Sequence, residues 1–158
     1  MARVLIVYHT RTGNTKKMAE LIREGISGGG VDVEMKNIED TVPDDLLEYE
    51  GILFGCPTYY GVMPAVFKEL VDKSIIFHGR LAGKVGGAFA SSANVGGGNE
   101  TTILSVLHAL LIHGMIIQGD ASGDHYGPVS IGAPDERARQ ECARFGRRFA
   151  ELVKRLYP

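Results

Sequence analysis

Apolar residues follow two different patterns along this chain, and the two alternate from one end to the other. Short continuous apolar runs are typical of parallel strands buried on both faces, whereas apolar residues three and four positions apart are typical of helices with one buried face. The runs, with one alternating segment, predict strands over residues 4–7, 31–35, 51–55, 84–90 and 115–117. The spacing predicts helices over residues 16–26, 64–75, 100–113 and 134–157. In the last three helices, the apolar residues expected to face the core extend to Ile75, Leu111 and Leu156.

Five strands that alternate with helices predict an α/β protein of three layers, with one parallel sheet between two layers of helices. The strands at residues 4–7 and 51–55 are wholly apolar, so we expect them at the centre of the sheet. Residues 31–35 alternate between apolar and polar side chains, which is typical of an edge strand. With right-handed crossovers, this predicts the strand order 2-1-3-4-5. The switch point then lies between strands 1 and 3, where we expect a ligand at the carboxyl ends.

The composition narrows the class of protein. A chain of 158 residues is the size of a single domain, which we expect to span residues 1–158. The net charge of -2, from 17 basic and 19 acidic side chains, argues against nucleic-acid binding. Cys56 and Cys142 form no paired motif, and the histidine spacing indicates no metal site. No apolar segment has the length of a membrane span and the N-terminus has no signal-peptide pattern, so we expect a reduced, cytoplasmic protein.

The loop after the first strand has the composition of a phosphate site. It leads directly into the helix at residues 16–26 and consists of Thr10, Arg11, Thr12, Gly13, Asn14 and Thr15. Hydroxyl groups, an amide and free backbone N–H groups at a helix N-terminus suit a phosphate dianion. An ordinary helix N-cap is the alternative, but three hydroxyl side chains in one loop favour phosphate binding.

The loops after the third and fourth strands predict a flat ring beside that phosphate. The first of them contains Pro57, Thr58, Tyr59, Tyr60 and Gly61, and its two aromatic rings can stack on a flat ligand. The second contains Ser91, Ser92, Ala93, Asn94, Val95, Gly96 and Gly97, whose backbone can approach a ligand closely. Taken alone, each is also compatible with a surface turn or a flexible loop. Their convergence at one sheet edge predicts a flat, phosphorylated ligand.

These residues resemble the motifs of two related groups of flavoproteins. The run from Thr10 to Thr15 resembles the FMN-phosphate loop of flavodoxins. From Gly55 onward, the chain resembles the WrbA-type NAD(P)H:quinone oxidoreductases, with the motifs in the same order over nearly its whole length. The matching segments are residues 57–65, 81–84, 96–102, 113–115, 126–127 and 143–147.

The resemblance implies a flavodoxin-like α/β/α sandwich that binds FMN rather than FAD. It implies that residues 10–15 hold the phosphate and that residues 92–97 line the pyrimidine side of the ring. The residues implied to contact the ring and the ribityl chain are Thr58, Tyr59 and Tyr60. His113 matches a histidine that reaches the flavin pocket in the family, often across a subunit interface, and Tyr126 is counted with the cofactor-binding residues.

The chain departs from the WrbA-type proteins at two places that serve the acceptor side and the subunit interface. The segment at residues 118–125 is shorter than in the family and lacks its aromatic residue. The segment at residues 76–78 has no tryptophan, so Phe77 or His78 would have to cover the ring. Neither departure touches the loops that are expected to hold FMN.

The charges around the predicted ring favour an enzyme over an electron carrier. Electron-carrier flavodoxins typically place carboxylates around the flavin, whereas residues 57–63 and 91–99 contain no charged side chain and Arg11 adds a positive one. We therefore expect two-step hydride transfer from NAD(P)H to a quinone through FMN, with His113 or Tyr60 hydrogen-bonding the quinone oxygen. A one-electron carrier that serves a redox protein and a non-catalytic FMN-binding subunit remain alternatives.

Charge distribution and family resemblance both predict self-association. The helix at residues 134–157 is basic and residues 32–50 are acidic, and such opposite signs can steer copies of one chain together. The resemblance implies a homodimer or homotetramer. Two other folds with this alternation are disfavoured, because the chain lacks the GxGxxG of a dinucleotide-binding domain and the carboxylates of a phospho-acceptor receiver domain.

Overall fold

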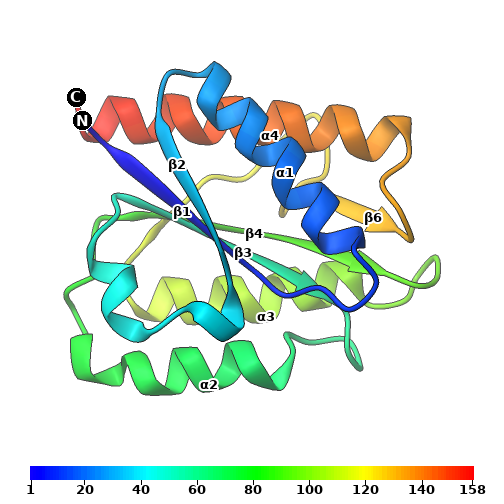
Figure 1. Ribbon diagram of the computed structural model, residues 1–158, viewed down its shortest axis with the longest axis horizontal. Coiled ribbons are helices and arrows are strands. Elements are labelled where there is room, and N and C mark those ends of the chain that lie inside the picture. Colours follow the sequence, from blue (N-terminus) through cyan, green and yellow to red (C-terminus); the bar gives the residue numbers. More distant parts are fainter.

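The computed structural model describes residues 1–158, and one parallel sheet forms its centre (Figure 1). The strands follow the predicted order, β2-β1-β3-β4-β5. Their bounds are Arg3–Tyr8 for β1, Asp32–Asn37 for β2, Gly51–Pro57 for β3, Val85–Ser92 for β4 and Ile116–Ile117 for β5. β3 and β4 are buried almost throughout, whereas the first half of β2 alternates between exposed and half-buried residues. The continuous apolar runs therefore mark the central strands. Each of these strands has helices over both faces and a neighbouring strand along both edges, so all of its side chains are covered.

Two pairs of helices cover the two faces of the sheet. α1 (Asn14–Gly28) and α4 (Glu136–Leu156) lie side by side on one face, and α2 (Ala65–Lys73) and α3 (Asn99–Ile112) lie on the other (Figure 1). α1 and α4 approach closely because a Cβ at Gly25 or Gly146 would overlap the backbone of the opposite helix. Residues 38–47 add two 3-10 turns, η1 (Ile38–Asp40) and η2 (Pro43–Leu47). The predicted three-layer architecture is confirmed.

The sheet divides the apolar core into two clusters. Leu5 and Val7 of β1 face the cluster under α2 and α3, whereas Val4 and Ile6 face the cluster under α1 and α4. This alternation follows from the two-residue period of side chains along a strand. It also determines the side of the sheet on which each residue just beyond a strand end lies.

The fifth position of the sheet is occupied by two short strands, so the predicted count of five strands is one too low. β5 pairs with the start of β4 at Val85 and Gly86. A sixth strand, β6 (Val129–Ile131), pairs with residues 90–92 at the end of β4. Both run parallel to β4. The polar and glycine-rich stretch between them leaves the sheet, because it offers few apolar side chains to pack against the neighbouring layers.

Asp120 holds this outlying stretch against α4. Its carboxylate accepts hydrogen bonds from the Arg144 guanidinium and from the Ser122 N–H, and forms an ion pair with Arg148 at 2.8 Å. Burial alone would raise the pKa of Asp120, but these partners outweigh it and lower the pKa to about 2. The brace keeps β6 beside the carboxyl end of β4, where the predicted ligand loops begin.

Three apolar residues that were expected to face inward are exposed. Ile75 lies beyond the end of α2 in the 3-10 turn η3 (Ser74–Phe77), where the helical spacing no longer applies, and it is 67% exposed. Leu111 and Leu156 lie in the last turns of α3 and α4 and are 56% and 40% exposed. The spacing rule fails at these positions because it assumes that a helix stays covered to its last residue.

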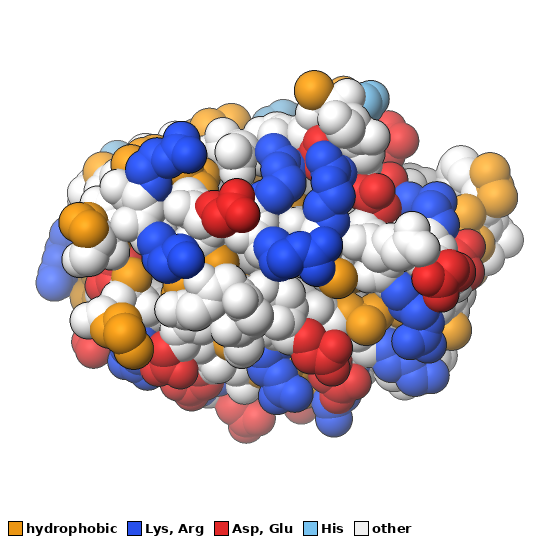
Figure 2. Space-filling view, turned by 90° about the horizontal axis from the view of Figure 1, so that it is seen from above, with side chains coloured by type: hydrophobic (Ala, Val, Ile, Leu, Met, Phe, Trp, Pro, Cys, Tyr) orange, Lys and Arg blue, Asp and Glu red, His pale blue; other side chains and the backbone are white.

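The face of the molecule that α1 and α4 form carries many basic side chains. Figure 2 looks onto the face of the molecule that α1 and α4 form, and Lys and Arg side chains spread across it with single acidic ones between them. The exposed basic residues of the two helices are Lys16, Lys17, Arg23, Arg137, Arg139, Arg147, Lys154 and Arg155. No helix of the structure combines the length and the apolar character needed to cross a membrane.

Candidate functional site

The loop from β1 to α1 presents an uncapped helix N-terminus. Gly13 occupies the N-cap position with φ of 93°, and no side chain caps the helix there. The Gly13 N–H donates instead to Thr10 Oγ1 at 2.9 Å, and the space where a Cβ would stand is open. The first N–H groups of an uncapped helix carry the positive end of its dipole. This geometry fits the predicted phosphate site.

Thr15 and Ser91 join the first and third loops. Their hydroxyls share a hydrogen bond of 2.8 Å, although the residues are 76 positions apart, and both side chains are buried. Both were predicted as cofactor-binding residues. The structure engages the two hydroxyls with each other, and this hydrogen bond holds α1 against the end of β4.

The loop after β3 makes a tight turn that presents Tyr60 to solvent. The Val62 N–H donates to the Tyr59 carbonyl, and Tyr60 adopts φ of 52° while its side chain is fully exposed. A left-handed conformation costs a non-glycine residue about 1–2 kcal/mol. Strain of this kind gathers at ligand sites, because the surrounding structure is what holds it.

The loop after β4 packs against that turn. Gly98 precedes α3 with φ of 97°, and a Cβ there would lie 2.8 Å from the Cα of Gly61. The Thr58 N–H donates to the Ser91 carbonyl at 2.8 Å, which continues the β3–β4 ladder into both loops. The remaining predicted residues of this loop are exposed at its tip: Ala93, Asn94, Val95, Gly96 and Gly97. The three predicted loops therefore converge at one edge of the sheet.

A hollow of about 700 Å³ opens between the first two loops, and we name it the edge hollow. Its lining residues are His9, Thr10, Arg11, Thr58, Tyr59 and Tyr60. Two buried polar atoms in this lining, His9 Nδ1 and Thr58 Oγ1, have no hydrogen-bond partner in the protein. A buried polar group left unpaired costs about 1–3 kcal/mol, so such groups usually mark the place of a ligand or ordered water. The lining thus fits a ligand with a phosphate, hydroxyl groups and a flat ring.

His9 is the lining residue that the sequence prediction missed. The predicted phosphate loop begins at Thr10, one position later. The position of His9 in the sequence could have identified it, since it is the first residue after a buried strand at the switch point of the sheet. Arg11 is the only charged residue in the lining.

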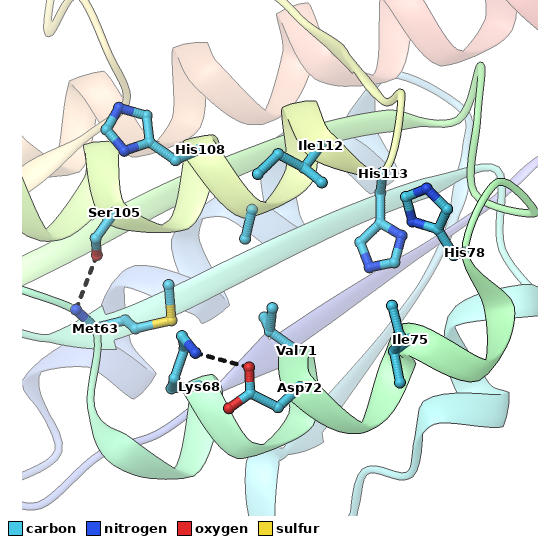
Figure 3. Close-up of a pocket in the computed structure, with 11 residues that line it drawn as sticks. Met63, Lys68, Val71, Asp72, Ile75, His78, Ser105, His108, Ile112 and His113 are labelled. Carbon is cyan, nitrogen blue, oxygen red and sulfur yellow. Dashed lines mark hydrogen bonds and ion pairs between the residues drawn. The ribbon is translucent and has the colours of Figure 1, made fainter.

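His113 does not lie at the edge hollow. It follows the last residue of α3, whereas the loop after β4 enters α3 at its first residue, and a helix of 14 residues is about 20 Å long. His113 instead lines a groove of about 530 Å³ between α2 and α3, which we name the helix groove (Figure 3). A single chain therefore cannot bring His113 to the three loops.

Hydrogen bonding fixes the tautomer of His113. The Ser74 hydroxyl donates its one proton to the Val71 carbonyl at 2.7 Å, so its oxygen accepts from His113 Nε2 at 2.7 Å. His113 Nδ1 is then a bare acceptor, buried and without a partner. Burial, and to a smaller extent the charge of His78, lowers the pKa of His113 from its ordinary value of 6.5. Its hydrogen bond to Ser74 joins the C-cap residue of α3 to the C-cap residue of α2.

Tyr126 also lies outside the edge hollow. It precedes β6 by three positions, and its neighbour Gly127 packs against the carbonyl of Ala88 in the middle of β4. Its side chain is 46% exposed on the outer edge of the sheet. Of the predicted residues, the structure therefore gathers those of the three loops and leaves His113 and Tyr126 apart from them.

Comparisons with known proteins find similar sequences and structures over most of the chain. The family model described as flavodoxin matches residues 6–105. The NAD(P)H dehydrogenase (quinone) of Archaeoglobus fulgidus is 35% identical over 190 residues, covering 99% of this chain and all of that protein. The flavodoxin of Aquifex aeolicus is 40% identical over 162 residues, covering 97% of this chain and 88% of that protein. The crystal structure of a WrbA-like flavodoxin from Agrobacterium tumefaciens superimposes with a TM-score of 0.79 at 26% identity, covering 98% of this chain and 99% of that one.

Proposed function

This chain belongs to the flavodoxin family, and on that premise we propose that it is an FMN-dependent oxidoreductase that transfers electrons from NAD(P)H to quinone-type acceptors. FMN, when bound, would supply the redox chemistry, through which a hydride equivalent from NAD(P)H reaches the quinone in two steps and one proton from solvent completes the hydroquinone. Curated relatives with the name NAD(P)H dehydrogenase (quinone) support this activity. The protein contributes binding, orientation and the electrostatics of the site.

Each loop has a distinct part in this proposal. The loop from Thr10 to Asn14 and the N-terminus of α1 would hold the phosphate, since they offer hydroxyl and N–H donors to an anion. Tyr59 and Tyr60 would lie against the flat ring, and residues 92–97 would offer backbone N–H groups to its polar edge. The Thr15–Ser91 hydrogen bond would keep the phosphate loop and the ring loop in register.

One observation carries the choice of an enzyme over an electron carrier. No carboxylate lines the edge hollow, and the two loops expected around the ring contain no charged residue. A carboxylate 5 Å from a negatively charged ring would raise its free energy by about 3 kcal/mol at an effective dielectric constant of 20. Without that repulsion, the site tolerates negative charge on a reduced ring, which favours two-electron chemistry.

Tyr60 is the residue we assign to the acceptor. Its phenol is fully exposed on the rim of the edge hollow, so it can donate a hydrogen bond to a quinone oxygen. The expected outcome for Tyr60→Phe is slower quinone reduction with unchanged oxidation of NAD(P)H. His113 was predicted to hydrogen-bond the quinone oxygen, but within one chain it lies in the helix groove. It can have that role only if a second copy of the chain brings its own His113 to the flavin site, as in the proposed homodimer or homotetramer.

An anaerobic rapid-mixing experiment tests the proposed function. The FMN-loaded protein is mixed with NADH or NADPH, and the visible absorbance of the flavin is followed. The proposal expects complete bleaching in one two-electron phase, followed by recovery of the absorbance when a quinone is added. If neither nucleotide reduces the flavin and a chemical titration resolves two separate one-electron steps, the proposal is wrong.

The second outcome would assign the chain to the electron carriers. A specific observation favours that alternative: the phosphate loop has the flavodoxin pattern, and the flavodoxin of Aquifex aeolicus is 40% identical to this chain. The same experiment separates the two functions, because only an enzyme of the proposed kind must react directly with a nicotinamide nucleotide.

A further inference from the structure

His9 places an unpaired polar atom where the phosphate loop meets the ring loop. It directly follows β1, and its N–H donates to the Gly55 carbonyl at 3.1 Å, which continues the β1–β3 ladder by one residue. Its imidazole meets the Tyr59 ring edge-on, with centroids 6.2 Å apart and planes at 86°. The backbone and the aromatic contact together hold the side chain, yet its Nδ1 remains buried without a partner.

Thr58 brings a second unpaired atom to the same side of the sheet. Val7 and Cys56 belong to the cluster under α2 and α3, and His9 and Thr58 each stand two positions further along the same strands. Because side chains alternate along a strand, both residues continue that face beyond the strand ends. His9 Nδ1 and Thr58 Oγ1 both line the edge hollow and both lack partners.

We infer that His9 binds the ribityl chain of FMN through Nδ1, an inference that rests on the proposed binding of FMN. The phosphate already has its donors in the next five residues and in the N-terminus of α1. The flat ring has its surface in the tyrosines of the following loop. The chain of hydroxyl groups that joins phosphate to ring must pass between these two places, where His9 and Thr58 stand.

The chemistry of the two atoms matches a chain of hydroxyl groups. A neutral imidazole nitrogen is either a donor or an acceptor, depending on the tautomer, and a threonine hydroxyl is both. A phosphate oxygen can only accept, whereas each ribityl hydroxyl can donate and accept, so it satisfies both atoms whichever tautomer His9 adopts. Pairing them removes the penalty of two unpaired polar groups, and this gain appears as affinity for the cofactor.

Three flavins and two variants test the inference. FMN carries ring, ribityl chain and phosphate, riboflavin lacks the phosphate, and lumiflavin lacks both the phosphate and the ribityl chain. Dissociation constants for the apoprotein are measured from the change in flavin fluorescence. His9→Phe keeps a planar ring against Tyr59 but has no nitrogen, and His9→Asn restores a polar atom at the position of Nδ1.

We expect His9→Phe to weaken the binding of FMN and of riboflavin by the same factor, about five- to tenfold, and to leave the binding of lumiflavin unchanged. His9→Asn is expected to recover most of the loss. His108→Phe, an exposed histidine of the helix groove, is the matched control and should bind all three flavins as the parent does. Thermal unfolding of each apoprotein verifies that the variants fold.

Each other result overturns the inference. If the His9→Phe protein binds all three flavins as tightly as the parent does, water alone satisfies Nδ1. If only the affinity for FMN falls, His9 contacts the phosphate. If the affinity for lumiflavin falls equally, His9 contacts the ring. If the parent binds none of the three, this inference and the proposed function both fail. Flavin binding without reduction by nicotinamide nucleotides would overturn the proposed function alone.

Discussion

The edge hollow and the helix groove are similar in volume but differ in how they are built. Loops at the carboxyl ends of β1 and β3 form the edge hollow, whereas side chains from the middle and ends of α2 and α3 form the helix groove. Each contains a histidine with an unpaired Nδ1. In the groove, His113 is buried and its Nε2 is hydrogen-bonded to Ser74. The apolar lining residues are Met63, Val71, Ile75, Ala109 and Ile112, and polar or charged residues, among them the Lys68–Asp72 ion pair, line the rest.

Apolar volume alone does not identify a ligand site. The edge hollow combines two unpaired polar atoms from different loops with a strained tyrosine, and the loop that begins in its lining leads to the uncapped N-terminus of α1. The helix groove has one unpaired atom, and its remaining features are those of two helices with incompletely covered faces. Substitutions in the two regions should therefore have separable effects, on cofactor affinity in the first and on stability or association in the second.

The largest effect on affinity is expected from Gly98→Ala. The new Cβ would press against the Cα of Gly61 while the residue is held at positive φ, so the two ring loops must separate. We expect FMN to bind about thirtyfold more weakly, which corresponds to about 2 kcal/mol, as measured by fluorescence titration. Gly79→Ala is the control, since Gly79 also has positive φ but faces open space away from the loops. The FMN affinity of this variant should equal that of the parent. An equal loss of affinity in it would show that the contact between Gly98 and Gly61 is not the cause.

Ser74→Ala should affect the helix groove and not the edge hollow. It removes the oxygen that accepts from His113 Nε2, which leaves both imidazole nitrogens buried without partners. We expect the free energy of unfolding to fall by about 1–3 kcal/mol, measured by urea denaturation of the apoprotein, with unchanged FMN affinity. Ser27→Ala, at an exposed position of α1, should change neither quantity. A drop in FMN affinity in the Ser74 variant would show that the two regions are coupled.

His113 should make stability depend on pH. Its pKa is lowered in the folded chain, so below about pH 6.5 the unfolded chain binds more protons and the free energy of unfolding falls. The contribution of one group cannot exceed about 1.4 kcal/mol per pH unit. Urea denaturation between pH 7.5 and 5 measures the slope, and His113→Gln should reduce it. If parent and variant have the same slope, another titratable group causes the pH dependence of stability.

The smallest effect on the folded chain is expected from Ile112→Gln. Ile112 is 74% exposed on the helix groove, so the free energy of unfolding should change by no more than about 0.5 kcal/mol. If copies of the chain associate through this groove, the mass measured by light scattering will fall towards that of a monomer. Val42→Gln, at an exposed position on the opposite side of α2, is the control. An oligomer that ignores both changes would place the interface elsewhere.

Most of the fold could be predicted from the burial pattern. The continuous apolar runs of β1 and β3 and the alternation of β2 are enough to place the strands, because burial on one or two faces leaves a direct mark on residue type. The split fifth position escaped prediction, since β5 and β6 are too short to show a period. The exposure of Ile75 escaped because a 3-10 turn replaces the last turn of α2.

The three loops and their convergence could be predicted from residue types alone, because a parallel sheet brings the ends of its strands to one edge. Which polar atoms in those loops stay unpaired depends on how the folded chain packs. Thr15 and Ser91, 76 positions apart, turned out to engage each other, whereas His9 and Thr58 have no partner. By contrast, the length of α3 separates His113 from the edge hollow, and the helix predicted over residues 100–113 already implied that separation. Whether a hydrogen bond forms depends on differences of a few tenths of an ångström in the distance between two atoms, and residue type alone does not encode such differences for residues remote in the chain.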